Sequence, residues 1–239
     1  GANIGYLWGT LNRNSTNSYS DSYVNTLSKN YTAQVKSYKA DFGVQYTYPI
    51  DRKNELTLGL AYSLGHTLNA EPECDLISTN SQTSVSDTTR YVVSKAFELP
   101  HTFGVGLMFN HNNRLKFGVD YQLQKWAKIR YPQLNTVNGT TSYSLVDGQF
   151  NDRHKLTLGG DYCKGERYRG FFSRMHYRAG FSYASPYLKI NGQDGPRELS
   201  ASLGVGIPIM NAYNNRSMLN ISAEWVNQSA TGLIKENTF

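Results

Sequence analysis

Charged side chains recur at alternate positions in several segments of this 239-residue sequence, between apolar and aromatic residues. The acidic members are Asp41, Asp120, Asp161 and Glu224, and the basic members are Lys39, Lys116 and Arg178. Opposite charges on neighbouring strands attract one another, so the first interpretation is ion pairing that rigidifies a sheet. Two pairs fit this ion-pairing interpretation, Lys39 with Asp41 and Lys116 with Asp120. The alternative is that Lys39, Lys116 or Arg178 binds the carboxylate headgroup of a ligand.

Two apolar residues, Met108 and Leu7, lie at alternate positions that we expect to share the inward face with these charges. Either could contact a hydrophobic solute, although the simpler interpretation is that they fill space. We therefore take Met108, Lys39, Lys116 and Arg178 as candidate ligand-binding residues, and the four acidic residues as structural charges.

The sequence offers little for catalysis or metal binding. Its five histidines are scattered, and no serine–histidine or histidine–cysteine–aspartate spacing indicates a catalytic group or a metal site. We predict no enzyme activity, metal or cofactor. Cys74 and Cys163 are too distant in sequence for a disulfide framework. One long-range disulfide and two free thiols both remain open, and free thiols are the simpler interpretation.

The elements that must position these residues are β-strands. Between Tyr38 and Tyr48, aromatic and apolar residues alternate strictly with Lys39, Asp41, Gly43, Gln45 and Thr47, which separates two faces only on a strand. The same alternation predicts strands at residues 4–8, 55–64, 103–109, 115–124, 156–162, 177–183, 199–207 and 219–225, with the start of a tenth at Phe239. Glycines recur on the polar face of these strands, where they would leave room for a plug or allow bending.

The connections alternate between short and long. We expect short turns at residues 49–54, 110–114, 164–170 and 208–216, and long polar loops at 12–30, 69–99, 128–153, 186–197 and 227–237. This order is typical of bacterial outer-membrane barrels, which have tight periplasmic turns and long extracellular loops. Aromatic residues near the strand ends and strands of about ten residues also favour a membrane barrel over a soluble sandwich.

Composition agrees with that interpretation. A mean hydropathy of −0.53 combined with 18 tyrosines suits a wall that is apolar outside and polar inside. The net charge of +6 is scattered rather than clustered, so we predict no nucleic-acid partner. The predicted fold class is therefore all-β, a transmembrane antiparallel β-barrel of the bacterial outer membrane. Because such barrels close with an even number of strands, we expect one barrel domain over residues 1–239 that is the C-terminal part of a larger barrel.

The segment from Phe97 to Lys128 resembles the FadL/TodX family of outer-membrane transporters, in versions similar to those of Bacteroidetes. The resemblance lies in Leu99–Pro100, the alternating Gly104 and Gly106, Arg114, Asp120–Tyr121 and Trp126; residues 1–9 and 152–162 are similar to other strands of that family.

The resemblance implies a barrel of 14 strands with an N-terminal hatch and passive uptake of long-chain fatty acids or aromatic hydrocarbons. The hatch and first strands of that family match no part of this sequence, so their residues cannot be carried over. Expected partners are membrane lipid, lipopolysaccharide and the hydrophobic solute. The alternative is a scaffold or shuttle in a secretion or surface complex, similar to PorV, with a protein partner at the extracellular loops. A general diffusion porin is a third interpretation.

Overall fold

The computed structural model describes residues 1–21, 23–137, 140–165, 170–210 and 216–239, and these are almost entirely β-strand. The main sheet is antiparallel and 13-stranded. Its long strands are β1 (Ala2–Asn17), β2 (Thr26–Pro49), β3 (Asn54–Ser63), β9 (Thr102–His111), β10 (Leu115–Gln124), β13 (Arg153–Tyr162), β14 (His176–Ala184), β17 (Arg197–Met210), β18 (Arg216–Ala230) and β19 (Ile234–Thr238).

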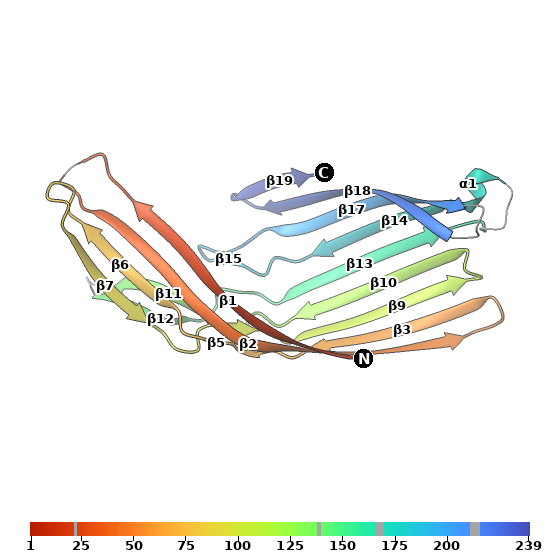
Figure 1. The fold of residues 1–239 in the computed structure, drawn as a ribbon, viewed down its shortest axis with the longest axis horizontal. Helices are drawn as coiled ribbons and strands as arrows, with labels where there is room; N and C mark the ends of the chain where they lie inside the picture. The colour runs from red at the N-terminus through yellow and green to blue at the C-terminus, as the bar shows by residue number, and fades with distance from the viewer. Residues whose placement is uncertain (22, 138–139, 166–169, 211–215) are drawn as a thin grey trace.

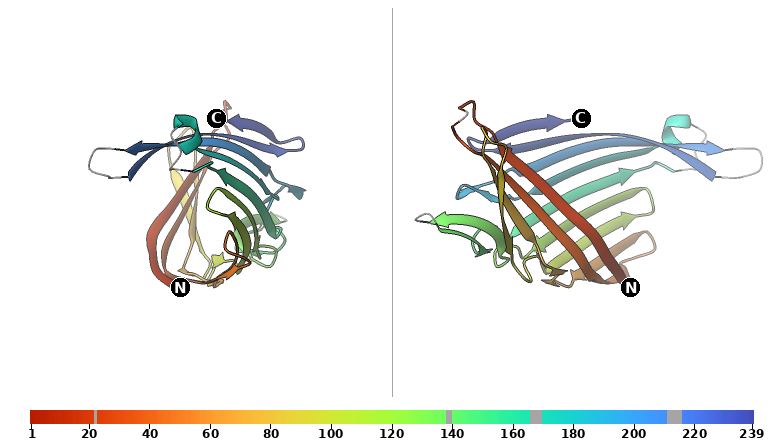
Figure 2. Two further views of the ribbon diagram at one scale, coloured as in Figure 1. Left: turned by 90° about the vertical axis from the view of Figure 1, so that its right-hand side faces the viewer. Right: turned by 60° about the vertical axis from the view of Figure 1, so that its left-hand side comes forward.

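These ten strands pair in chain order from β1 to β19 and curve around a central space (Figures 1 and 2). β1 lies at one edge and β19 at the other, so the described part of the sheet is open. The sheet has the antiparallel, all-β architecture that the alternation predicts, the wall of an outer-membrane β-barrel. Among the described residues, no helix is long and apolar enough to cross a membrane.

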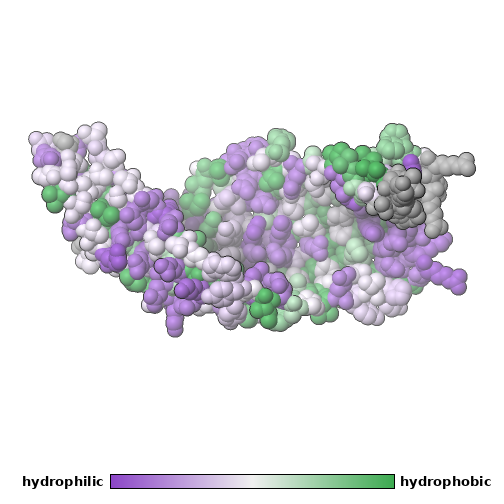
Figure 3. Space-filling view, in the orientation of Figure 1, coloured by the Kyte–Doolittle hydropathy of each residue, from purple (hydrophilic) through white to green (hydrophobic). Residues whose placement is uncertain are grey.

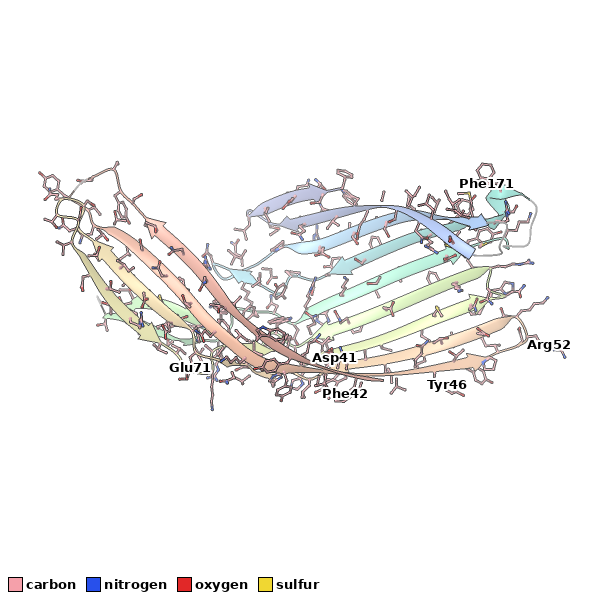
Figure 4. The ribbon with its side chains drawn as sticks, viewed as in Figure 1. Asp41, Phe42, Tyr46, Arg52, Glu71 and Phe171 are labelled. Atoms are coloured by element: carbon pink, nitrogen blue, oxygen red, sulfur yellow. The ribbon has the colours of Figure 1, made fainter. Side chains whose placement is uncertain are left out.

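Register gives the main sheet two distinct faces from residue 41 onward. Apolar residues pair with apolar residues across the sheet, as in Phe42 with Tyr62, Leu58 with Leu107, and Leu203 with Ala223. In Figure 4, Phe42 and Tyr46 lie on the outside of the curve and Asp41 on the other side. Large side chains of the outer face remain exposed, Val44 by 68% and Leu203 by 70%. A continuous exposed apolar face is stable when it contacts lipid.

The predicted loops are more ordered than the sequence suggested. Residues 12–30 are not a loop, because β1 continues to Asn17 and β2 begins at Thr26, with Thr16 and Ser28 joined by their hydroxyls at 3.0 Å. The polar composition was misleading, since a strand pair with water on both sides needs no apolar alternation. Residues 227–237 are likewise mostly strand: β18 extends to Ala230 and β19 begins at Ile234, earlier than the predicted start at Phe239.

The remaining long loops form small sheets. They contain β4 (His66–Thr67), β5 (Asn69–Ala70), β6 (Glu73–Thr79), β7 (Ser86–Val92), β8 (Glu98–Leu99), β11 (Tyr131–Val137), β12 (Thr140–Val146), β15 (Lys189–Ile190) and β16 (Gln193–Asp194). β6 and β5 pair with the outer half of β2, so β1, β2, β6 and β7 form an arm that projects from the wall at the left of Figure 1. Hydrophilic and intermediate residues cover most of this arm in Figure 3.

We call residues 2–40, 64–101, 125–152 and 185–196 the cap, and the rest of the sheet the wall. The cap contains seven of the ten buried hydrophobic residues among those described, namely Ala33, Ala40, Ala70, Cys74, Ala96, Ile129 and Phe150. The opposite end of the wall has short connections at residues 50–53 and 112–114, as predicted. It also has the short helix α1 (Phe171–Arg174), while the predicted turns at 164–170 and 208–216 fall partly outside the described residues.

Candidate functional site

The inner face of the wall has a floor made largely of glycine. Strand pairing places Gly59 opposite Gly106, Gly118 opposite Gly159, and Gly159 opposite Gly180. The full set, which we call the glycine floor, is Gly43, Gly59, Gly104, Gly106, Gly118, Gly159, Gly180, Gly204 and Gly206. All nine lie on the face where the alternation predicted them.

Glycine at two of these positions makes room for a neighbouring polar side chain. A Cβ atom at residue 106 would overlap the carboxylate of Asp120, and one at residue 180 would lie 2.7 Å from the Ser202 hydroxyl. At these two positions the side chains of Asp120 and Ser202 occupy the space that a larger residue on the neighbouring strand would fill.

Two hollows lie over the glycine floor. One, of about 640 Å³, runs from Gln45 past Asp120 to Lys155. The second, of about 520 Å³, contains Met108, Lys116 and Arg178 on its lining. The structure thus brings three of the four predicted ligand-binding residues, contributed by β9, β10 and β14, around one hollow. Met108 remains 38% exposed there, opposite Thr57 and Gly118.

Arg178 is held by a fixed polar network at the turn end of this hollow. Its Nε donates to Asp161 Oδ2 at 2.8 Å, and its guanidinium also donates to Asn220 Oδ1 at 2.8 Å. Asp161 Oδ1 lies 2.8 Å from His176 Nδ1. These contacts occupy Arg178 with structural partners, which favours the ion-pairing interpretation for Arg178 and Asp161.

Lys116 differs from Arg178. It faces Asp161 in the register, but Asp161 is already bonded to Arg178 and His176. Within the part of the chain that the structure describes, the Lys116 ammonium makes no hydrogen bond or ion pair. Asp120 lies on the same face but is four residues away along an extended strand, so the two charges do not pair as the sequence suggested. Lys116 is therefore a cation available to a ligand.

The other predicted charges lie apart from this hollow. Lys39 Nζ and Asp41 Oδ2 form the predicted ion pair at 3.2 Å, near the junction of wall and cap. Glu224 lies on the inner face opposite Ser202. Leu7 pairs with Ser37 in the cap, away from Met108. Because Lys39 is far from Met108 along the sheet, the four predicted ligand-binding residues do not form one group.

Aromatic residues border the wall on its outer face. Near the loop end, Tyr62 and Tyr121 place their hydroxyls 2.8 Å from His101 Nδ1 and 2.7 Å from His154 Nδ1. Near the turn end, Tyr162 and Tyr177 are register partners. Aromatic side chains with a polar tip are typical of the two membrane interfaces, so these rows mark the edges of the apolar band.

The structure brings one serine and one histidine together, a contact that sequence spacing did not reveal. Ser37 Oγ lies 3.0 Å from His66 Nε2, and the His66 ring stacks on Tyr38 at 4.1 Å between centroids. However, His66 Nδ1 is buried without a hydrogen-bond partner, and Ser37 is only 8% exposed. A serine nucleophile needs an oriented base and access to substrate, so this pair lacks the features of a catalytic group.

The two cysteines lie in different parts of the molecule. Cys74 lies buried in the cap and Cys163 at the turn end, and both are free thiols. Among the described residues, no group of three histidine, cysteine, aspartate or glutamate side chains could hold a metal ion.

Comparison with known proteins identifies the family. The BamG family model matches residues 1–239. The chain belongs to the BamG family. No curated protein matches this BamG-family chain in sequence. The Phe97–Lys128 segment that resembles FadL/TodX transporters is thus part of a BamG sequence.

This chain shares its fold with solved structures of hydrocarbon channels. The CymD monoaromatic hydrocarbon channel is 16% identical with a TM-score of 0.60, and the match covers 95% of this chain and 64% of CymD. A TodX deltaS2S3 mutant monoaromatic hydrocarbon channel is 14% identical with a TM-score of 0.54, over 95% and 65% of the two chains. The toluene transporter TbuX of Ralstonia pickettii is 14% identical with a TM-score of 0.50, over 94% and 62%. The chain therefore spans slightly less than two thirds of these structures.

Proposed function

We propose that this BamG-family chain is part of a channel in the outer membrane through which small hydrophobic molecules diffuse. The observation that carries the proposal is the hollow over the glycine floor, which Met108 and Lys116 both line, Lys116 having no ion pair among the described residues. An apolar contact beside a free cation suits a solute with a hydrophobic body and an acidic headgroup, such as a long-chain fatty acid. The fold shared with CymD, a hydrocarbon channel, supports a transport role over an enzymatic one.

The wider setting follows from the two faces of the wall. Its exposed apolar face would contact membrane lipid and, in the outer leaflet, lipopolysaccharide. We propose that the cap lies outside the cell, because long loops are extracellular in bacterial barrels. We also propose that the protein comes from a bacterium similar to Bacteroidetes.

The test uses the full-length protein purified in detergent, with co-purified small molecules extracted and identified by mass spectrometry. We expect fatty acids or hydrocarbons in the unmodified protein and their loss from Met108→Asn. Lys116→Gln should remove fatty acids selectively, because only the headgroup contact is lost, while Lys235→Gln on exposed β19 serves as the matched control. Equal recovery from all four proteins would contradict the proposal.

One observation favours a second function, that of a scaffold in a secretion or surface complex. The arm made by β1, β2, β6 and β7 projects beyond the wall and is mainly hydrophilic (Figures 1 and 3). A projecting polar sheet suits a protein partner. This function would be favoured if the purified protein carried no small molecule but held a stable partner chain. The partner should then be lost when residues 80–85, at the tip of β6 and β7, are shortened.

A further inference from the structure

We propose that the lipid-facing side of the wall holds lipopolysaccharide at a defined site, with acyl chain in an apolar groove and anionic headgroup on the polar edge above it. The site lies near the cap end of β3, β9, β10 and β13, on the side of the sheet opposite the glycine floor. The inference deepens the proposed function and rests on its placement of the cap outside the cell, because lipopolysaccharide occupies the outer leaflet.

The groove is a hollow of about 460 Å³ in the outward face of the sheet. It lies between outward side chains of four neighbouring strands, and Phe42, which borders it, lies on the outside of the curve in Figure 4. The other large aliphatic and phenylalanine side chains on its border are Val44, Leu60, Phe103, Val105 and Leu123. Among the described residues, no charged side chain lines it. Such a lining suits a hydrocarbon chain.

Two tyrosines connect this groove to two histidines on its cap side. Tyr62 and Tyr121 both line the groove. Tyr62 Oη lies 2.8 Å from His101 Nδ1, and Tyr121 Oη lies 2.7 Å from His154 Nδ1. The ring planes of Tyr62 and His101 differ by only 15°. The two imidazoles are therefore held at the edge of the apolar band, directly above the groove.

Each imidazole keeps one nitrogen for a ligand. The Gly65 N–H donates to His101 Nδ1 at 3.2 Å, so Nδ1 is an acceptor and the ring hydrogen is on Nε2. Among the described residues, Nε2 of His101 and Nε2 of His154 make no hydrogen bond, and both residues are exposed. A phosphate oxygen can accept a hydrogen bond from such a nitrogen.

A lysine lies beside His101 on the same edge. The Lys125 N–H donates to the His101 carbonyl oxygen at 2.9 Å, and Lys125 comes two residues after the outward Leu123. Its ammonium bonds to the carboxylate of Asp152, but the Lys125 side chain remains 50% exposed. An ammonium has three hydrogens, so Lys125 can donate to Asp152 and to a phosphate together.

Arg197 adds a positive charge further along this edge. Leu156, Tyr183 and Leu199 are outward register partners across β13, β14 and β17. His154 and Arg197 each lie two residues nearer the cap than the first and last of these, so both point outward, two strands apart. Among the described residues, Arg197 forms no ion pair, and its hydrogen bond is to a serine hydroxyl.

The width of this polar edge distinguishes lipopolysaccharide from a phospholipid. From His101 on β9 to Arg197 on β17 there are four interstrand spacings, about 19 Å in all. The single phosphate of a phospholipid cannot contact donors that far apart. Lipopolysaccharide joins several acyl chains to a broad sugar headgroup with more than one anionic group, so one molecule can occupy the groove and the whole edge.

Binding can be measured by microscale thermophoresis on the full-length protein in detergent, with rough lipopolysaccharide and the same lipid after chemical dephosphorylation. We expect the phosphorylated form to bind at least tenfold more tightly, since charge-assisted bonds are lost with the phosphate. His101→Leu with His154→Leu should weaken its binding about tenfold, and Arg197→Gln about threefold. The matched control is Arg153→Gln: Arg153 is next to His154 but on the inner face, 3.9 Å from Glu198, and its loss should leave binding unchanged.

Three results would overturn this site: equal binding of the two lipid forms, unchanged binding in the double histidine variant, or displacement of lipopolysaccharide by phosphatidylglycerol at equal concentration. Val105→Trp provides a check if the double variant folds poorly, because it fills the groove and leaves both tyrosine–histidine contacts intact. It should weaken binding at least fivefold, and unchanged binding in both Val105→Trp and Arg197→Gln would also overturn the site.

The failure of this site and the failure of the channel are distinguishable. Lipopolysaccharide binding by a protein that yields no fatty acid or hydrocarbon on extraction would contradict the channel alone. Recovery of those solutes from a protein whose lipopolysaccharide binding is the same in every site variant would contradict this site alone.

Discussion

The wall and the cap of this molecule are built on opposite principles. In the wall, large apolar side chains point outward and stay exposed, such as Ile221 at 54%, while the inner face consists of glycine and polar residues. The cap instead contains most of the buried hydrophobic side chains among the described residues, and its aromatic rings pack on one another around Phe150. The same chain thus folds one part for lipid and the other for water.

The wall and the cap also differ in the shape of the hollows that they contain. The wall provides a shallow surface with few large side chains, so Met108 and Lys116 stand out against glycine. The cap provides a deeper pocket formed by several segments.

The largest effect should come from the cap core. Phe150→Ala removes a buried ring that contacts Trp126 and Tyr131, and we expect it to destabilise the cap locally by about 3–5 kcal/mol. Hydrogen exchange of residues 125–152 should accelerate while the wall strands stay protected. Phe172→Ala, whose side chain is 74% exposed, is the control with the same chemical change. Unchanged exchange in the cap would show that the rings do not form a core.

The next largest effect should distinguish the two faces of the wall. Leu107→Arg places a charge on the lipid face and should cost about 2–4 kcal/mol of folding free energy in bilayers. Met108→Arg, one residue away on β9, places the same charge on the inner face and should cost much less. Urea titrations of both variants in lipid vesicles test this difference, and equal costs would contradict the assignment of faces.

The smallest effect concerns an ion pair at the boundary of the two regions. Burial tends to raise the pKa of Asp152, but hydrogen bonds from the Lys125 ammonium and the Ala127 N–H outweigh it, so the pKa is lowered. A lowered folded-state pKa gives stability that is complete above the ordinary value of 3.8 and is lost as pH falls through the folded-state value. Asp152→Asn should therefore lower cap stability at pH 7 by no more than about 1 kcal/mol.

This pH effect can be isolated by comparing the variant with the unmodified protein. Hydrogen exchange of the cap should differ between the two at pH 7, and the difference should shrink as the pH falls below 3.8. A difference that stayed constant with pH would assign the effect to packing instead.

The sequence by itself determined the wall. Strict alternation from Tyr38 to Tyr48 and in the later strands identified both faces, because a strand in a membrane must present apolar groups to lipid at every second residue. The same pattern placed all nine residues of the glycine floor and the inward position of Met108, Lys116 and Arg178. It also identified the short turns at residues 50–53 and 112–114.

Only the tertiary structure decided which of these charges pair and what the loops form. Asp161 has Lys116 on one neighbouring strand and Arg178 on the other, and the choice of Arg178 depends on side-chain reach across the sheet, which no alternation encodes. In the cap, Tyr31, Tyr131 and Tyr143 meet although about 100 residues separate the first from the others, and polar strands there carry no periodic signal. Long-range packing in water, unlike contact with lipid, leaves no regular pattern in a sequence.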